Sequence, residues 1–167
     1  ANTGKKMKVI QELPGSVSRS PDGKYAYWYN MITQDYYTMT PASEQPVNVT
    51  ASINTMLADE ENDSPTEPYP YGIAGWTDDD QFILVNDRYD IWKVDPSGKS
   101  DPINLTNGRK NKVVYRYIDL DRDEPGIDLT EMLLLHIFDE NDKTSGYARM
   151  QNGAAPTEIM KTNHSYS

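Results

Sequence analysis

Short runs of apolar and aromatic residues alternate along this chain with turn residues, and the arrangement recurs. The run Tyr25–Trp28 follows the turn Pro21–Gly23, and 57 positions later the run Phe82–Val85 follows the turn Thr77–Asp80. Strands with one wet face would alternate strictly between apolar and polar residues, whereas such nearly continuous runs are typical of strands covered on both faces. The pattern therefore predicts short antiparallel strands in units that repeat about every 56 residues.

Three such units can be read along the chain, at residues 16–50, 72–106 and 113–161, each with four strands. A unit of four short antiparallel strands joined by tight turns corresponds to one blade of a β-propeller. We therefore expect an all-β fold, a partial β-propeller of about three four-stranded antiparallel blades. The expected strands are Ser16–Ser20, Lys24–Asn30, Asp35–Thr40, Val47–Thr50, Gly72–Trp76, Gln81–Asn86, Tyr89–Val94, Pro102–Thr106, Val113–Ile118, Glu131–Phe138, Gly146–Met150 and Glu158–Lys161.

The segments outside these strands complete one domain over residues 1–167. An acidic, Pro-rich insertion at residues 51–71 joins the first two units, and we expect a helical turn in it near Ile53–Leu57. Met7–Leu13 is expected to form a further strand, and Asp119–Thr130 is an insertion in the third unit. A blade cannot bury both of its faces alone, so we interpret the chain as a piece of a larger protein.

Charge and composition exclude several classes of function. The chain carries 26 acidic and 16 basic residues for a net charge of −10, which argues against a nucleic-acid partner. The basic cluster Arg109–Lys112, with Arg116 nearby, is interpreted as a solvated turn. Cysteine is absent, which rules out disulfides and thiolate metal sites. No apolar run approaches the ~20 residues that span a bilayer, and we recognise no signal peptide.

Three segments make the pattern more specific: Tyr71–Thr77, Asp87–Trp92 and Asn104–Gly108. Together they resemble the β-propeller of prolyl-oligopeptidase-type serine peptidases, in particular the large bacterial members related to dipeptidyl and acylaminoacyl peptidases. The resemblance covers most of the chain, from about Ser16 to Lys161. The turn Ser20–Lys24 is shared with propellers of the TolB type.

The resemblance implies a parent protein in which the propeller caps an α/β-hydrolase domain with a Ser, Asp and His triad. The propeller then restricts access to short peptides, and the parent is expected to be extracytoplasmic. The hydrolase domain is missing from this chain, and no Gly-x-Ser-x-Gly nucleophile elbow occurs in it. No catalytic residue is therefore assigned, and no cofactor is expected.

Glu60 and Glu61 are the candidate substrate-binding residues. Dipeptidyl peptidases of this family hold the amino terminus of the substrate with paired glutamates on a propeller insertion, and adjacent carboxylates suit an ammonium group. The alternative is a solvated acidic loop, since Asp59, Asn62 and Asp63 surround the pair.

Metal sites are not expected. The segment Asp119–Glu124 has the alternating carboxylates of a calcium loop, but its sixth position is Glu124 where an EF-hand needs Gly. Its twelfth position is Thr130 where Glu is needed. His136 lies in an apolar run and is expected to be a packed strand histidine, with only His164 as a companion, too few ligands for zinc.

The triplets Asn48–Thr50, Asn104–Thr106 and Asn163–Ser165 match the N-glycosylation pattern, and the first two fall on the same repeat position. We interpret these two as a shared way of ending a strand.

Two functions remain open. We favour a non-catalytic propeller fragment that gates or orients peptide substrates for a hydrolase domain, and the alternative is a TolB- or WD40-like propeller that acts as a protein-binding scaffold. In either case a partial propeller exposes apolar sheet surface. We therefore expect homo-oligomers through exposed blade faces, at the strands that bear Trp28 and Leu133 or at the flanks of the outer blades.

Overall fold

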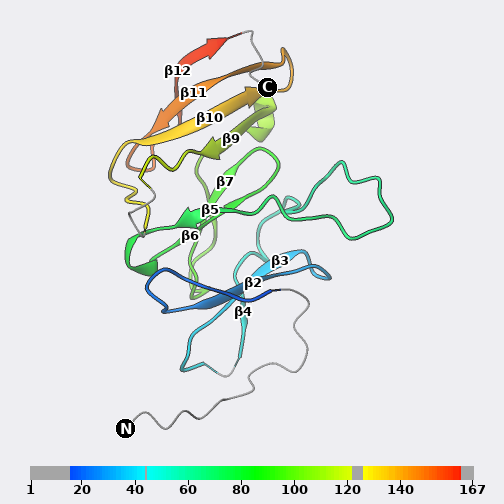
Figure 1. The fold of residues 1–167 in the computed structure, drawn as a ribbon, viewed down its shortest axis with the longest axis vertical. Helices are drawn as coiled ribbons and strands as arrows, with labels where there is room; N and C mark the ends of the chain where they lie inside the picture. The colour runs from blue at the N-terminus through cyan, green and yellow to red at the C-terminus, as the bar shows by residue number, and fades with distance from the viewer. Residues whose placement is uncertain (1–15, 44, 122–125, 163–167) are drawn as a thin grey trace.

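Three four-stranded antiparallel sheets follow one another along the chain in the computed structural model, which describes residues 16–43, 45–121 and 126–162 (Figure 1). Each sheet is a meander in which strands that are neighbours in the sequence are also paired. The strands are β1 (Ser18–Arg19), β2 (Ala26–Asn30), β3 (Asp35–Met39), β4 (Val47–Asn48), β5 (Ile73–Trp76), β6 (Ile83–Asn86), β7 (Ile91–Val94), β8 (Ile103–Asn104), β9 (Val113–Tyr117), β10 (Leu133–Asp139), β11 (Thr144–Met150) and β12 (Thr157–Thr162).

The all-β prediction is confirmed, and a strand lies within or across each of the twelve predicted segments. The only helices among the described residues are two short 3-10 turns, η1 (Asp78–Asp80) and η2 (Arg109–Asn111). The predicted helical turn near Ile53–Leu57 is wrong, because residues 53–57 form no helical turn and contain only bends at Thr55 and Leu57. The predicted strand Met7–Leu13 lies outside the described residues.

The repeat is visible at the level of single atoms where the fourth strand of a unit ends. In the first sheet the Thr50 hydroxyl accepts a hydrogen bond from the Tyr36 amide at 2.9 Å and donates to the Asp35 carboxylate at 2.9 Å. The Asn48 side-chain oxygen in turn accepts from the Thr50 amide at 3.1 Å. In the second sheet the same roles belong to Thr106, Ile91, Asp90 and Asn104. The two Asn-x-Thr triplets therefore close strand ends, as interpreted from the sequence.

The middle sheet supplies side chains to two hydrophobic cores. All four residues of β6 are buried, and successive side chains of a strand point to opposite faces. Ile83 and Val85 pack into the core shared with the first sheet, whereas Leu84 packs into the core shared with the third. The continuous apolar run in the sequence is therefore explained by burial on both faces.

The first core is rich in aromatic residues and the second in aliphatic ones. In the first core the Trp76 ring packs on Tyr25 and Tyr27, with centroids 5.9 and 5.3 Å apart. In the second core Leu135 is fully buried and Ile137 nearly so. Tyr25 and Tyr27 thus line the interface between the first two sheets, each of them half-buried.

Asp80 ties the first sheet to the second by hydrogen bonds. Its side chain is buried in the η1 turn, and its carboxylate accepts from the Ser20 hydroxyl at 2.5 Å. It also accepts from the backbone amides of Asp22 at 3.2 Å and Lys24 at 3.1 Å. The turn between β1 and β2, to which Ser20, Asp22 and Lys24 belong, also contains Gly23 at a φ of 74°, a conformation that glycine adopts without steric cost. One carboxylate therefore caps the turn that the sequence pattern predicts.

The two side chains that mark the strands expected to mediate self-association are themselves buried. Trp28 is 4% exposed and stacks on Tyr37, and Leu133 is 6% exposed within the second core. Self-association through these strands or the flanks of the outer sheets stays a prediction, and it would use other side chains of the strands. The exposed apolar side chains of the third sheet include Tyr147 and Met160.

We predict that Asp80→Asn lowers the free energy of unfolding by about 1–3 kcal/mol, because donors that face the carboxylate lose an acceptor in a buried site. Equilibrium unfolding in urea measures this change. The neighbouring Asp79→Asn is the matched control and should cost less than about 1 kcal/mol, since its side chain is 76% exposed. Equal losses in the two variants would show that Asp80 does not link the sheets.

Candidate functional site

Glu60 and Glu61 lie in the insertion of residues 51–71, just after two residues that are buried in the first core. Leu57 and Ala58 are buried in the first core, and the backbone of residues 57–59 is bonded to that of residues 69–71. The Glu60 amide also donates to the Tyr71 hydroxyl at 3.0 Å. The two glutamates therefore directly follow a segment that hydrogen bonds hold against residues 69–71.

Each of the two glutamates pairs with a different arginine: Glu61 with Arg88 of the second repeat unit, and Glu60 with Arg109 of the η2 turn that follows this unit. The Arg109 guanidinium holds Glu60 in a two-point contact, with N–O distances of 2.6 and 3.3 Å. Arg88 Nη2 donates to Glu61 Oε1 at 2.6 Å. The Glu60 side chain is 21% exposed, whereas that of Glu61 is 72% exposed. The structure thus separates an enclosed carboxylate from one that faces solvent.

The buried carboxylate of Asp87 organises the turn that carries Arg88. Asp87 is fully buried and accepts hydrogen bonds from the Tyr89 and Asp90 amides, both at 2.7 Å. It also accepts from the Thr55 hydroxyl at 2.7 Å and the Trp92 indole N–H at 3.0 Å. Thr55 belongs to the 51–71 insertion, so Asp87 joins the insertion to the second sheet. Arg109 Nη2 lies 3.4 Å from the same carboxylate.

The third sheet joins the cluster through Glu140, which directly follows β10. Its carboxylate accepts from Arg88 Nη2 at 2.9 Å and Nε at 3.2 Å, and from the Tyr89 hydroxyl at 2.7 Å. The Arg88 and Arg109 guanidinium carbons lie 5.2 and 5.0 Å from the Tyr89 ring centroid, within the range of cation–π attraction. We call the set Glu60, Glu61, Asp87, Arg88, Tyr89, Arg109 and Glu140 the arginine–glutamate cluster.

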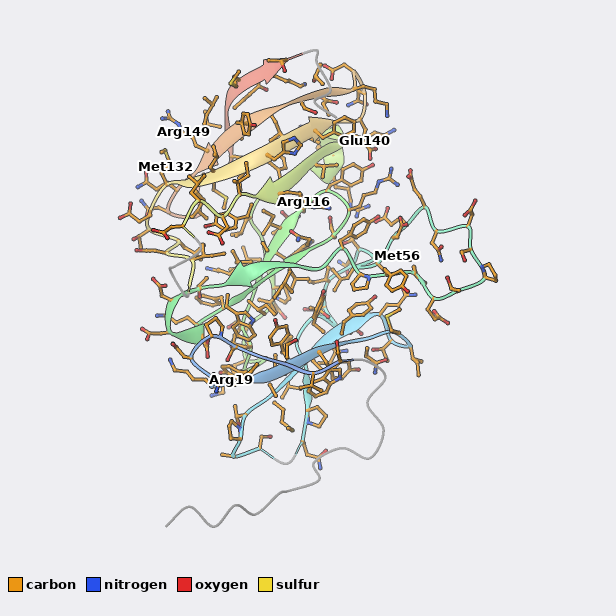
Figure 2. The ribbon with its side chains drawn as sticks, viewed as in Figure 1. Arg19, Met56, Arg116, Met132, Glu140 and Arg149 are labelled. Atoms are coloured by element: carbon orange, nitrogen blue, oxygen red, sulfur yellow. The ribbon has the colours of Figure 1, made fainter. Side chains whose placement is uncertain are left out.

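Arg116 supports the cluster from β9. Its Nη2 atom donates to the backbone carbonyls of Asp87 at 2.9 Å and Arg88 at 3.0 Å. Its guanidinium also lies over the Tyr71 ring, 5.7 Å from the centroid. In Figure 2, Glu140 and Met56 are labelled toward the right of the view, where the insertion extends, and Arg116 is labelled nearer the middle of the molecule.

The pairing within the cluster shifts the pKa values of Arg88, Arg109 and Glu140 in the direction that favours their charged forms. The hydrogen bond to Glu140 raises the pKa of Arg88, and the bond to Glu61 adds to this effect. Burial raises the pKa of Glu140, but the hydrogen bonds from Tyr89 and Arg88 outweigh it and lower the pKa overall. Burial lowers the pKa of Arg109, while Glu60 and Asp87 more than compensate and raise it.

Sequence reasoning missed the arginines. Arg109 begins the basic segment that we interpreted as a solvated turn, yet it is half-buried and bound to Glu60. Arg116 is likewise bonded to backbone carbonyls. The solvated-turn interpretation is therefore wrong for these two residues and fits only Lys110 and Lys112, which are exposed. No spacing rule could have found the pairs, because 49 positions separate Arg109 from Glu60.

The remaining candidates are distributed elsewhere. His136 lies on β10, half-buried, with its ring 6.2 Å from that of Tyr147 in an edge-on contact. Of the segment Asp119–Glu124, whose carboxylates alternate as in a calcium loop, residues 122–124 lie outside the described residues, and so does His164. Among the residues that the structure describes, no group of three or more His, Asp or Glu side chains could hold a metal ion. No helix in the described ranges is long and apolar enough to cross a bilayer.

The cluster can recognise a small polar group at one exposed position. Glu61 presents a carboxylate that Arg88 fixes in place, and an ammonium group could donate hydrogen bonds to it. Glu60 is occupied by the two-point contact with Arg109, so its role is to hold the insertion in position. The two adjacent glutamates are therefore not equivalent.

Comparison of the chain with protein-family models, with curated protein sequences and with solved structures found no match. The chemistry of the site is accordingly argued from the residues of this chain alone.

We predict that Asp87→Asn destabilises the protein by about 2–4 kcal/mol at pH 7, because the change removes a buried charge beside Arg109. Burial raises the pKa of Asp87, but hydrogen bonds from Thr55, Trp92 and two amides lower it overall. Since the folded pKa lies below the unfolded value of about 3.9, this contribution is present above pH 4 and is lost as the pH falls through the folded pKa.

The difference in unfolding free energy between wild type and Asp87→Asn should therefore shrink between pH 7 and pH 3 in urea titrations. The exposed Asp101→Asn is the control, with an expected change within about 0.5 kcal/mol at either pH. A wild-type stability at pH 7 equal to that of Asp87→Asn would contradict the organising role of this carboxylate.

Proposed function

We propose that the chain is a non-catalytic part of a β-propeller from a prolyl-oligopeptidase-type serine peptidase, and that the three sheets are successive blades. The support is the order of the strands, since each sheet is a four-stranded meander and the first two close their fourth strands with the same Asp, Asn and Thr contacts. Blades of a propeller have this topology.

The function of such a segment is to orient short peptides for a hydrolase domain on another part of the parent protein. The observation that carries this proposal is the position of Glu61, an exposed carboxylate fixed by Arg88 on a braced insertion. A peptide with a free amino terminus brings an ammonium group that can bind there. Glu60 and Arg109 keep the insertion in place.

A second function, a protein-binding scaffold of the TolB or WD40 type, is favoured by a different observation. The outer side of the third sheet carries exposed apolar residues, among them Tyr147 and Met160. Exposed apolar surface of this kind is typical of a docking surface. The two functions differ in the affinities that they predict for peptides. A site that orients peptides binds a free amino terminus more tightly than a blocked one, whereas a scaffold has no need to distinguish the two.

We predict that trialanine with a free amino terminus binds the chain at least about tenfold more tightly than N-acetylated trialanine. The reason is that acetylation removes the charge that Glu61 binds, and a charge-assisted hydrogen bond contributes about 1.5–3 kcal/mol. Titration followed by NMR chemical shifts measures weak affinities of this kind.

Glu61→Gln should weaken the binding of the free peptide about tenfold and leave the acetylated peptide unaffected. Glu67→Gln, an exposed glutamate of the same insertion, is the matched control and should bind as the wild type does. Equal affinity for the two peptides in the wild type would overturn the peptide-orienting function and leave the scaffold.

A further inference from the structure

Two Asn-Gly dipeptides occur in the chain, Asn107–Gly108 and Asn152–Gly153. Asparagine is a chemically labile residue, and before glycine it deamidates: the backbone nitrogen of the glycine attacks the side-chain amide carbon, and ammonia leaves as a succinimide ring forms. Glycine permits this attack more readily than other residues, because it has no Cβ to crowd the nitrogen. The reactivity of each pair in the folded protein therefore depends on how its glycine amide is held.

Asn152 and Gly153 lie at the centre of an exposed turn in the loop that joins β11 to β12. The Ala154 amide donates to the Gln151 carbonyl at 3.0 Å, and the φ angles of Asn152 and Gly153 are 53° and 70°. Positive φ at both central residues is typical of a type I′ turn. Both residues are exposed, and no atom of the described residues lies within 4 Å of the place where a Cβ of residue 153 would stand.

The nitrogen of Gly153 is open to react. Within the described ranges its amide makes no hydrogen bond, and the bonds that hold the turn use the amides of Asn152 and Ala154 instead. Neither of these bonds involves the attacking nitrogen, so the turn can flex toward the geometry of attack without breaking a bond at Gly153.

Gly108 is held at its nitrogen, its oxygen and its Cα. Its amide donates to the buried carboxylate of Asp90, and its carbonyl accepts from the Val113 amide at 3.1 Å. A Cβ at this position would collide with the Val113 carbonyl oxygen and lie 2.8 Å from the Tyr115 ring. Gly108 is buried, although Asn107 is exposed. The surrounding structure therefore fixes the glycine on which a succinimide would have to form.

The bond to Asp90 also opposes the reaction itself. The attacking species is the amide nitrogen after loss of its proton, and a carboxylate disfavours a second negative charge beside it. The carboxylate accepts this same proton from Gly108, so the bond has to open before the nitrogen reacts. Breaking a hydrogen bond to a charged acceptor lowers the reactive population about tenfold or more.

We propose that Asn152 is a site of spontaneous deamidation in the folded protein, and that Asp90 protects Asn107 from the same reaction. A bond forms between the Gly153 nitrogen and Asn152 Cγ, the Cγ–Nδ2 bond breaks, and the side-chain nitrogen leaves as ammonia with the proton of the Gly153 amide. Water then opens the succinimide at either carbonyl, which yields aspartate or isoaspartate. This reaction is independent of the peptide-orienting function, because neither asparagine belongs to the arginine–glutamate cluster.

The products change the loop between β11 and β12. In isoaspartate the main chain runs through Cβ, which lengthens the backbone by one carbon atom inside the turn. The bond from the Asn152 amide to the Leu129 carbonyl at 3.1 Å, and that from Ala154 to Gln151, both depend on the turn geometry. Either product also adds one negative charge to a chain whose net charge is −10. The modified protein is therefore a more acidic form with a loosened loop.

Incubation of the folded 167-residue chain at mildly alkaline pH, followed by peptide mapping with mass spectrometry, tests the proposal. We expect Asn152 to convert at least about tenfold faster than Asn107, because only Gly108 has to break a bond to a carboxylate. In concentrated urea at the same pH the two sites should convert at similar rates, since unfolding removes the contact with Asp90. Each molecule thus contains its own matched control.

Two further measurements separate the chemistry from the fold. Gly153→Ala should slow the conversion of Asn152 and leave Asn107 unchanged, because the added Cβ crowds the attacking nitrogen. Native-state hydrogen exchange should show the Gly108 amide exchanging at least about tenfold more slowly than the Gly153 amide. Circular dichroism melts establish that the variant is folded.

The proposal is overturned if Asn152 stays unmodified in the folded chain, or if the two asparagines convert equally there. An unchanged rate at Asn152 in folded Gly153→Ala would also contradict it. Equal exchange of the Gly108 and Gly153 amides would show that Asp90 gives no protection.

Discussion

The burial of the middle sheet on both faces is the constraint on which the rest of the structure depends. Ile83 and Val85 pack toward the first sheet and Leu84 toward the third, so both cores include residues of one four-residue strand. Because apolar burial is the main favourable term in folding, neither outer sheet is stabilised without the middle one. Asp80 and Glu140 then add polar contacts to the first and third units at the ends of the middle sheet.

The sequence predicted the strands because their pattern is local. Alternation of apolar runs with turn residues depends on neighbours within a few positions, and so does the φ > 0 glycine at position 23. Side-chain pairs across the repeat depend on the register between sheets, which no local pattern encodes. From the sequence alone, we therefore interpreted Asp80 as an ordinary turn residue and Arg109 as a solvated one. Glu60 and Glu61 could be singled out as candidates, but their different exposure could not be foreseen.

The two surfaces discussed for function lie on different parts of the fold and rest on different physics. The arginine–glutamate cluster is polar and braced by Asp87, so it favours a small charged ligand in a fixed orientation. The third sheet carries exposed apolar side chains, among them Tyr147 and Met160, which favour contact with another apolar surface. The two surfaces do not compete, because the cluster uses none of these exposed apolar side chains.

The coding sequence that follows the codon for Ser167 tests the central claim most directly. The account predicts a Gly-x-Ser-x-Gly motif on a strand–turn–helix pattern within a few hundred codons, followed by Asp and then His in the order of an α/β-hydrolase. Further four-stranded repeats that end at a stop codon, with no such motif, would contradict the peptidase assignment and leave a propeller whose role is to bind other proteins.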